Sequence, residues 1–234
     1  MQLEDRSTLP DHVGILVVGA GMAGLTAARA LAAEGRDVLV VDKGYNPGGR
    51  MATRVTDRAR FDHGATFFYP TPGRFTADLE EWRRDGFAGA WEGLPTGEAL
   101  WHGLPDMRSL GSRLARGLAV ATRTRLTAVG SEAGRWVATL EKGGRITADA
   151  LVMTPPVPQT IALLAAGGFR LGSDLESRLG NISYPRCIVV MAELEGPERV
   201  PAPGFLEPGE GPVVRLVDEQ VKGTSPVPAV TLHA

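Results

Sequence analysis

The chain has 234 residues, of which 43% are hydrophobic and 22% are charged, and its formal net charge is −2. This composition is that of a globular protein with enough chain for one large or two small domains. The small net charge provides no field that would attract nucleic acid or an anionic membrane, so we expect neither partner.

Cysteine usage and the first residues bear on the compartment. A single cysteine, Cys187, excludes an intramolecular disulfide and a multi-cysteine metal site. It stands in the apolar run 187–191, which predicts a packed strand thiol rather than a nucleophile. Residues 1–11 have the polar character of a leader rather than of a secretory signal, and no apolar stretch reaches the roughly 18 residues of a membrane span. We expect a cytoplasmic protein.

Residues 13–42 contain the pattern of a dinucleotide-binding unit. The apolar run 13–18 predicts a buried strand, and a G-x-G-x-x-G turn follows it directly. An alanine-rich helix comes next and can end at Gly35, after which the apolar run 38–41 leads to Asp42. The turn consists of Gly19, Ala20, Gly21, Met22, Ala23 and Gly24.

Each glycine of this turn has a physical task. Gly19 permits the tight turn, Gly21 lets the backbone approach a pyrophosphate, and Gly24 lets the helix pack closely on the strand. The N–H groups at the start of the helix then face the phosphates. Asp42 lies 18 residues beyond Gly24, close to the spacing of an acid that accepts hydrogen bonds from a ribose diol.

A second glycine turn follows, in the run GGRMATR at residues 48–54, and the run FDHGATFF occupies residues 61–68. The glycine pair allows a second close approach of backbone to ligand, and Arg50 offers a planar cation for a phosphate. These two runs resemble the amine-oxidase-type flavoproteins, and most closely the renalase-like NAD(P)H-oxidising flavoenzymes. The family usually has Gln where this chain has Thr66.

The resemblance implies FAD as the cofactor. The resemblance implies that the first turn and Asp42 bind the adenosine and pyrophosphate of FAD, with Arg50 on the pyrophosphate side. It also implies that residues 64–67 run past the flavin ring and that the Leu126 backbone lies near the adenine. Beyond the first turn, the expected cofactor-binding residues are Asp42, Lys43, Gly49, Arg50, Met51, Gly64, Ala65, Thr66, Phe67 and Leu126.

In the middle of the chain the spacing of hydrophobic residues alternates between a helical period and a strand period. A helix is predicted around Phe75, Leu79 and Trp82, short strands within residues 87–103, and a second helix from Met107. Period-two runs then predict strands at residues 118–122, 126–129, 136–140 and 150–153. A parallel strand, an antiparallel meander and a return strand form the crossover typical of FAD-type Rossmann domains, whereas NAD-type domains use a helix.

We therefore predict an α/β fold: a Rossmann-type FAD-binding domain with a β-meander crossover, plus a mixed-sheet substrate domain. The expected FAD-binding domain takes residues 11–69 and 104–160, and the substrate domain takes residues 70–103 and 161–234. A strand interrupted by Pro185 is predicted at residues 182–194. The resemblance also implies that the chain is C-terminally incomplete, because the family's last strand, which carries a Gly-Asp pair, is not in this sequence.

The sequence gives little support for a metal site or for another kind of catalytic site. The histidines show no metal-ligand spacing, and we find neither a nucleophile elbow nor a phosphate loop of the G-x-x-x-x-G-K type. We interpret His63 as a local packing or hydrogen-bonding residue. His102, expected in a loop, is the better residue if a proton must move, although packing is favoured there too. No catalytic residue is identified.

The resemblance implies an enzyme that oxidises a dihydronicotinamide dinucleotide, with hydride transfer to FAD and O2 as the final acceptor, giving H2O2. Two alternatives remain. One is an amine oxidase or a carotenoid-type desaturase with the same cofactor fold. The other is a non-catalytic nucleotide-binding remnant. The sequence specifies no oligomeric state.

Overall fold

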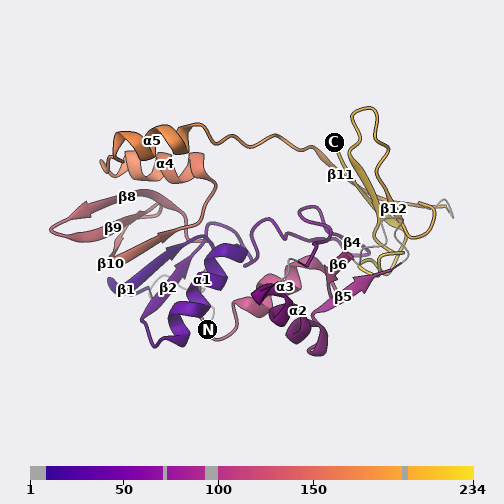
Figure 1. Cartoon of the computed structure of the whole chain (residues 1–234), viewed down its shortest axis with the longest axis horizontal. Coiled ribbons are helices and arrows are strands. Elements are labelled where there is room, and N and C mark those ends of the chain that lie inside the picture. Colours follow the sequence, from indigo (N-terminus) through magenta and orange to yellow (C-terminus); the bar gives the residue numbers. More distant parts are fainter. Residues whose placement is uncertain (1–8, 71–72, 93–99, 197–199) are drawn as a thin grey trace. The chain divides into compact units, whose positions relative to one another are not determined.

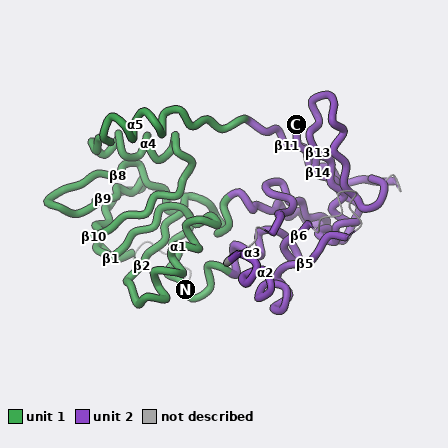
Figure 2. Tube along the Cα trace, viewed as in Figure 1, with its two compact units in different colours: residues 1–49, 114–185 green, residues 50–113, 186–234 purple. Residues whose placement is uncertain are grey.

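The computed structural model describes residues 9–70, 73–92, 100–196 and 200–234. Most of the expected leader, residues 1–8, lies outside the described residues. The described residues form two compact units, and each unit is assembled from two separate stretches of the chain (Figures 1 and 2). Unit 1 contains residues 1–49 and 114–185, and unit 2 contains residues 50–113 and 186–234.

Unit 1 is built on a sheet with the strand order β7-β2-β1-β10-β9-β8. Its strands are β1 (His12–Val18), β2 (Val38–Val41), β7 (Ala119–Ala121), β8 (Leu126–Glu132), β9 (Arg135–Leu140) and β10 (Arg145–Met153). The pairs β7/β2, β2/β1 and β1/β10 are parallel, whereas β10/β9 and β9/β8 are antiparallel. The crossover from β7 to β10 is therefore a β-meander, as the sequence predicts, and the α/β fold class is confirmed.

The helices of unit 1 are α1 (Met22–Ala33), α4 (Val157–Ala166) and α5 (Ser173–Gly180). α1 ends as predicted, because Gly35 follows it with a φ of +72°. Figure 1 shows α4 and α5 beside the meander. Leu164 of α4 belongs to the same buried hydrophobic cluster as Val129 of β8 and Leu140 of β9. The apolar runs of β1 and β2 supply the centre of the core, where Leu16 is fully buried.

Unit 2 contains a sheet with the strand order β11-β14-β13-β12 and two short hairpins. The sheet strands are β11 (Val189–Glu193), β12 (Phe205–Leu206), β13 (Arg215–Asp218) and β14 (Ala229–His233). The hairpins pair β3 (Arg54–Val55) with β4 (Arg60–Phe61) and β5 (Ala88–Trp91) with β6 (Leu100–Gly103). The helices are α2 (Arg74–Arg84) and α3 (Met107–Leu114). Both helices lie where the hydrophobic spacing predicts them.

The two faces of the β11-β14-β13-β12 sheet differ in burial. Cross-strand pairing places Val190, Leu232, Leu216 and Leu206 in one row, so their side chains share a face. Val190 is 50% exposed and Leu206 is 46% exposed, although the row is apolar. On the opposite face Val217 and Thr231 are fully buried. The apolar row is thus left open to solvent.

The segment before β11 departs from its prediction. The predicted strand 182–194 is wrong in its first half, because β11 begins only at Val189, where pairing with β14 starts. The predicted packed thiol is also wrong: Cys187 is exposed and free. The apolar run suggested a strand, but the pairing with the end of the chain extends only to the Ile188–Ala234 backbone hydrogen bonds, and Cys187 lies before them.

The compact units divide the chain differently from the expected domains. Residues 50–69 and 104–113 group with unit 2, and residues 161–185 group with unit 1. The compact units reflect packing within the chain and do not show which residues contact a cofactor, so the expected domain ranges stay a prediction. In the described residues, no helix is long and apolar enough to cross a bilayer.

Candidate dinucleotide-binding site

The N-terminus of α1 lies directly after β1, at the carboxyl end of the parallel strands. Gly21 is its N-cap residue, with an extended backbone and no side-chain hydrogen bond to cap the helix. The first turn of the helix carries no acidic side chain. Because the first N–H groups of a helix have no intrahelical acceptor, this end of α1 offers donors and a partial positive charge to an anion.

The three glycines of the first turn meet different surroundings. Gly19 has a φ of +103°, and a Cβ there would lie 2.5 Å from the Thr154 hydroxyl. A Cβ on Gly24 would clash with the Gly19 carbonyl oxygen, so the fold itself requires both glycines. At Gly21 the nearest atom to a Cβ is 4.0 Å away, on Gly49. The space beside Gly21 is therefore open, as a site for a pyrophosphate requires.

Thr154 is a residue of this site that the sequence analysis did not select. It follows β10, and its hydroxyl donates a hydrogen bond to the Val18 carbonyl oxygen at 2.8 Å. The Thr154 N–H donates to the same oxygen at 3.0 Å. Thr154 thus fixes the end of β1 from the neighbouring strand. Only the pairing of β1 with β10, far apart in the sequence, reveals this contact.

Asp42 binds the glycine turn with its carboxylate. The Ala20 N–H donates to Oδ2 at 2.6 Å, and the Gly44 N–H donates to Oδ1 at 2.6 Å. Each carboxylate oxygen keeps a further lone pair, and the residue is half-buried. The structure therefore places Asp42 beside the turn, oriented and still able to accept hydrogen bonds from a ligand.

The second glycine turn lies against the first within unit 1. The Gly48 N–H donates to the Ala20 carbonyl oxygen at 2.7 Å, and Gly21 and Gly48 form an isolated parallel bridge. Gly49 has a φ of +57°, and a Cβ there would lie 3.0 Å from the Gly21 Cα. The structure thus brings together the two glycine turns that the sequence singled out separately.

Two other predicted binding residues of unit 1, Lys43 and Leu126, lie outside the glycine turns. The Lys43 ammonium donates to the Gln159 side-chain oxygen on α4 at 2.9 Å. Leu126 begins β8 and is 8% exposed, in the core. Their contacts with a cofactor stay predictions.

The remaining predicted binding residues lie in unit 2, where two runs of sequence pack side by side. The Ala65 N–H donates to the Arg50 carbonyl oxygen at 2.9 Å, and the Gly64 N–H donates to the Ala52 carbonyl oxygen at 3.2 Å. A Cβ on Gly64 would clash with the Arg50 carbonyl oxygen. The Arg50 side chain is exposed and Met51 is buried. The two runs that carry the family resemblance are therefore neighbours.

Thr66 and Phe67 follow this contact and differ in their surroundings. Thr66 is 1% exposed, and its hydroxyl has no hydrogen-bond partner among the described residues. The Phe67 ring packs edge to face on Phe205, with ring centroids 5.4 Å apart, and the Arg215 guanidinium lies 4.4 Å from the Phe67 centroid. Phe67 thus belongs to an aromatic cluster in which the Arg215 guanidinium contacts two rings, those of Phe67 and Phe205.

Unit 2 also contains a buried ionic network, defined here as Asp62, Glu219 and Lys222. The Lys222 ammonium lies 2.6 Å from Asp62 Oδ2 and 3.7 Å from Glu219 Oε2. The Thr53 hydroxyl donates to Asp62 Oδ1 at 2.6 Å, and the Asp62 N–H donates to Glu219 Oε1 at 3.0 Å. All three charged side chains are almost completely enclosed. This network joins the FDHGATFF run to the segment between β13 and β14.

Burial shifts the ionisation of two groups near the network. Desolvation raises the pKa of Glu219, although the Lys222 ammonium opposes the shift. Desolvation and then Lys222 lower the pKa of His102 to about 4. His102 lies in strand β6 and is 5% exposed, so its expected place in a loop is wrong. An enclosed, neutral imidazole of this kind packs rather than exchanges protons with a substrate.

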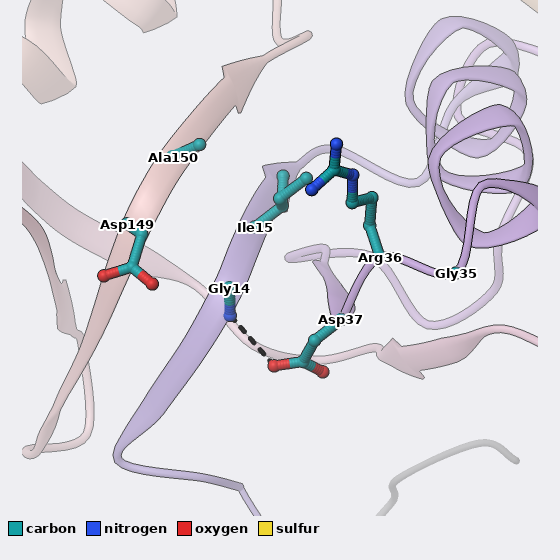
Figure 3. Close-up of a pocket in the computed structure, with 7 residues that line it drawn as sticks. All are labelled: Gly14, Ile15, Gly35, Arg36, Asp37, Asp149 and Ala150. Carbon is teal, nitrogen blue, oxygen red and sulfur yellow. Dashed lines mark hydrogen bonds between the residues drawn. The ribbon is translucent and has the colours of Figure 1, made fainter.

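A shallow pocket lies at the opposite end of the unit 1 sheet (Figure 3). It is lined by the first residues of β1 and by Arg36, Asp37 and Asp149. Figure 3 shows the Gly14 N–H donating to Asp37 Oδ2, at 2.9 Å. Ligands of open α/β sheets bind outside the carboxyl ends of the strands, and this pocket is at the amino ends. We therefore assign it no part in dinucleotide binding. Within the described residues there is also no cluster of three metal-ligating side chains.

Comparison with known proteins agrees with this geometry. Residues 17–82 match the family model of the NAD(P)-binding Rossmann-like domain. A hydroxyneurosporene desaturase from Rubrivivax gelatinosus is 54% identical over 54 residues, which are 23% of this chain and 10% of the desaturase. A putative flavin-containing monoamine oxidase (AofH) from Mycobacterium tuberculosis is 44% identical over 62 residues, which are 26% of this chain and 14% of that protein. The aligned part is thus a small share of either relative.

Solved structures share the fold over most of the chain. A putrescine oxidase variant superposes with a TM-score of 0.65 at 14% identity, covering 95% of this chain and 75% of the oxidase. A fatty acid isomerase from P. acnes superposes with a TM-score of 0.67 at 13% identity, covering 97% of this chain and 77% of the isomerase. Residues 17–82 therefore match a NAD(P)-binding Rossmann-like domain, and part of the chain is similar to a desaturase and to a flavin-containing monoamine oxidase.

Proposed function

We propose that unit 1 binds FAD and that this chain is part of a flavin-dependent oxidoreductase. The observation that carries the proposal is the open space at Gly21, beside the uncapped N-terminus of α1 and the fixed carboxylate of Asp42. Donors for a pyrophosphate and an acceptor for a ribose diol are thus found in one place. The shallow pocket at the other end of the sheet lies beside Gly35, after the C-terminus of α1, and not at a helix N-terminus.

FAD is favoured over NAD for two reasons. The crossover from β7 to β10 is a β-meander, which is typical of FAD-type domains. One relative, which matches 26% of this chain, is named as a putative flavin-containing monoamine oxidase. The N–H groups at the start of α1 would hold the pyrophosphate, Asp42 would hold the ribose, and Arg50 would add a cation on the phosphate side.

The chemistry that FAD supplies when bound is two-electron oxidation, with dioxygen as the final acceptor and hydrogen peroxide as the product. The chain itself supplies binding and orientation. Asp42 is pre-oriented by two backbone N–H groups, so little reorganisation is needed when a ribose binds. The backbone contact between Gly64 and Arg50 holds the two family-like runs of unit 2 in register.

For the substrate we favour a dihydronicotinamide dinucleotide, because the runs GGRMATR and FDHGATFF resemble the renalase-like flavoenzymes. The second candidate is an amine or a carotenoid-type substrate, and it is supported by two relatives, which are named as a flavin-containing monoamine oxidase and a hydroxyneurosporene desaturase. Under anaerobic conditions the substrate should bleach the visible absorbance of the FAD-loaded protein. Bleaching by dihydronicotinamide isomers favours the first class, and bleaching only by amines favours the second.

The cofactor proposal is tested by substituting Gly21. Its backbone suits any residue, so Gly21→Ala should fold normally while placing a methyl group in the phosphate site. We expect FAD affinity to fall by about tenfold or more, because a misplaced phosphate forfeits charge-assisted hydrogen bonds. Gly172→Ala is the matched control, since Gly172 is also an N-cap glycine with extended backbone and open surroundings. Equal FAD retention in both variants and the wild type would contradict the proposal, as would a wild type that does not take up FAD.

A further inference from the structure

We propose that Tyr45 and Arg123 form an adenine-binding platform at the carboxyl edge of the unit 1 sheet. The inference rests on the proposed dinucleotide site and extends it to two residues outside the glycine turns. The Arg123 guanidinium carbon lies 4.8 Å from the centroid of the Tyr45 ring. Tyr45 is 73% exposed, so the guanidinium covers one part of the ring and much of the rest is open.

The strand order indicates where the base of a bound dinucleotide would lie. In the order β7-β2-β1, the pyrophosphate site follows β1 and Asp42 follows β2. A dinucleotide that runs from the phosphates to the ribose along this edge directs its base toward the loop after β7. Tyr45 belongs to the loop after β2, and Arg123 belongs to the loop after β7. Both residues therefore lie at the part of the sheet edge toward which the base would point.

The two loops are joined by backbone hydrogen bonds. The Arg123 N–H donates to the Gly44 carbonyl oxygen at 2.7 Å, and the Thr124 N–H donates to the Asp42 carbonyl oxygen at 2.7 Å. Because Asp42 is itself bound to the glycine turn, the platform is held in a defined position relative to the phosphate and ribose sites. Arg123 also adopts a φ of +52°, a conformation that non-glycine residues rarely take and that is found more often at binding sites.

The chemistry of the pair suits a purine. A phenol ring offers a flat face to a base, and a guanidinium stacks on aromatic rings while remaining charged. Arg123 restrains the Tyr45 ring by a cation–π contact, so less side-chain freedom is lost when a base stacks on it. A stacked base requires no hydrogen-bonding partner from these residues, so stacking alone does not select one purine over another.

The test measures binding of ADP and of inorganic pyrophosphate to the full 234-residue chain by isothermal titration calorimetry. We expect Tyr45→Ala to weaken ADP binding by about tenfold and to leave pyrophosphate binding unchanged, since stacking on the base is lost. Tyr45→Phe should bind ADP as the wild type does. Arg123→Ala should weaken ADP binding by roughly threefold through the lost restraint.

The controls separate this inference from the cofactor proposal. Arg125→Ala removes a neighbouring exposed cation that pairs with Glu141, and it should bind ADP as the wild type does. A wild type that binds neither probe contradicts the dinucleotide site itself. If the wild type binds ADP and Tyr45→Ala binds it equally well, only the platform is overturned. An equal loss of ADP and pyrophosphate binding in Tyr45→Ala would also overturn it, because that outcome indicates a disturbed loop.

Discussion

Lys222 and Asp62 form an ion pair in which the ammonium nitrogen lies 2.6 Å from Oδ2 of the carboxylate and neither side chain is exposed. Asp62 also accepts hydrogen bonds from the Thr53 hydroxyl and from the Met107 N–H, at 2.6 and 3.1 Å. The carboxylate therefore joins three separate segments of unit 2. The FDHGATFF run is held in place from inside the unit, not by surface contacts.

Removal of the cation should destabilise unit 2 strongly. Lys222→Met leaves the Asp62 carboxylate enclosed without its ion-pair partner, and breaking a buried pair in this way costs about 3–5 kcal/mol of unfolding free energy. Trp91 reports on this region, since its ring centroid lies 5.9 Å from the Lys222 ammonium. Urea unfolding followed by tryptophan fluorescence measures the loss.

Two further variants calibrate this effect. The double variant Asp62→Asn/Lys222→Met should lose less stability than the sum of its single variants, because Asp62 is then neutral and Glu219, whose pKa is raised by burial, is the one acid of the network left without the ammonium. Asp174→Ala removes a pair whose side chains are 75% and 89% exposed, and it should change stability by less than about 0.5 kcal/mol. If Lys222→Met lost as little stability as Asp174→Ala, the Lys222–Asp62 pair would not be enclosed in solution.

Gly24→Ala should destabilise unit 1 even without a ligand. A Cβ there would clash with the Gly19 carbonyl oxygen and lie 2.9 Å from the Thr154 hydroxyl, and a backbone atom cannot move aside cheaply. We expect a loss of about 1–3 kcal/mol, as for an overpacked core. Thermal unfolding of Gly24→Ala and Gly21→Ala side by side tests this, since Gly21→Ala should retain the wild-type melting temperature.

Asp42 should affect both stability and affinity. Asp42→Ala leaves the Ala20 and Gly44 N–H groups without their acceptor, at a cost of about 1–3 kcal/mol in unfolding free energy. Asp42→Asn retains one oxygen acceptor and should lose less stability. Both variants should weaken FAD binding, measured by fluorescence titration of the refolded protein. Wild-type affinity in both would contradict the role of Asp42 at a ribose.

His102 should make unfolding depend on pH in the acidic range. Its pKa is about 4 in the folded chain against 6.5 ordinarily, so the unfolded chain takes up the proton first as pH falls. The free energy of unfolding should therefore decrease between pH 6.5 and 4, by up to about 3 kcal/mol, with no contribution above that range. Glu219 acts in the opposite direction, because its raised pKa favours the folded chain on protonation.

The difference between wild type and His102→Gln isolates this contribution. The titration of Glu219 is present in both proteins, so it largely cancels in the subtraction. Chemical denaturation at several pH values should show the two unfolding free energies converging toward acid pH. Parallel curves throughout would indicate that the imidazole is accessible to protons in the folded chain.

The open apolar row of unit 2 should promote self-association of this chain. Val190 is 50% exposed and Val214 is 60% exposed, both on or beside the uncovered sheet face. Contiguous exposed apolar surface of this kind favours aggregation. The double variant Val190→Thr/Val214→Thr should lower light scattering at high concentration without reducing the melting temperature. Leu175 on α5 of unit 1 is 44% exposed, so Leu175→Gln is a control that removes apolar surface outside this row and should not change the scattering.

Much of unit 1 could be predicted from the sequence because its signals are local. The apolar run 38–41 coincides with β2, Gly35 ends α1, and the G-x-G-x-x-G turn follows β1. Strand period, helix termination and glycine turns are set by neighbouring residues. The same holds for the meander, whose turns separate its strands in the sequence.

The parts that could not be predicted depend on contacts between distant residues. Thr154 reaches the glycine turn only because β10 pairs with β1, and Lys222 reaches Asp62 across 160 positions. Tyr45 and Arg123 meet only because β7 pairs with β2. The prediction for Cys187 is wrong for a different reason: an apolar neighbourhood predicts burial, but Cys187 lies just before the first paired residue, Ile188, and is exposed.

The interleaving of the two units has a consequence for the order in which the protein can fold during synthesis. β1 needs β10 as its neighbour, yet all of residues 50–113 are synthesised between them. Asp62 likewise has no ion-pair partner until Lys222 has been synthesised. Neither core can close on a nascent chain that stops at residue 113, so partly made chains expose apolar strands. High contact order of this kind slows folding, and we expect such chains to depend on chaperones.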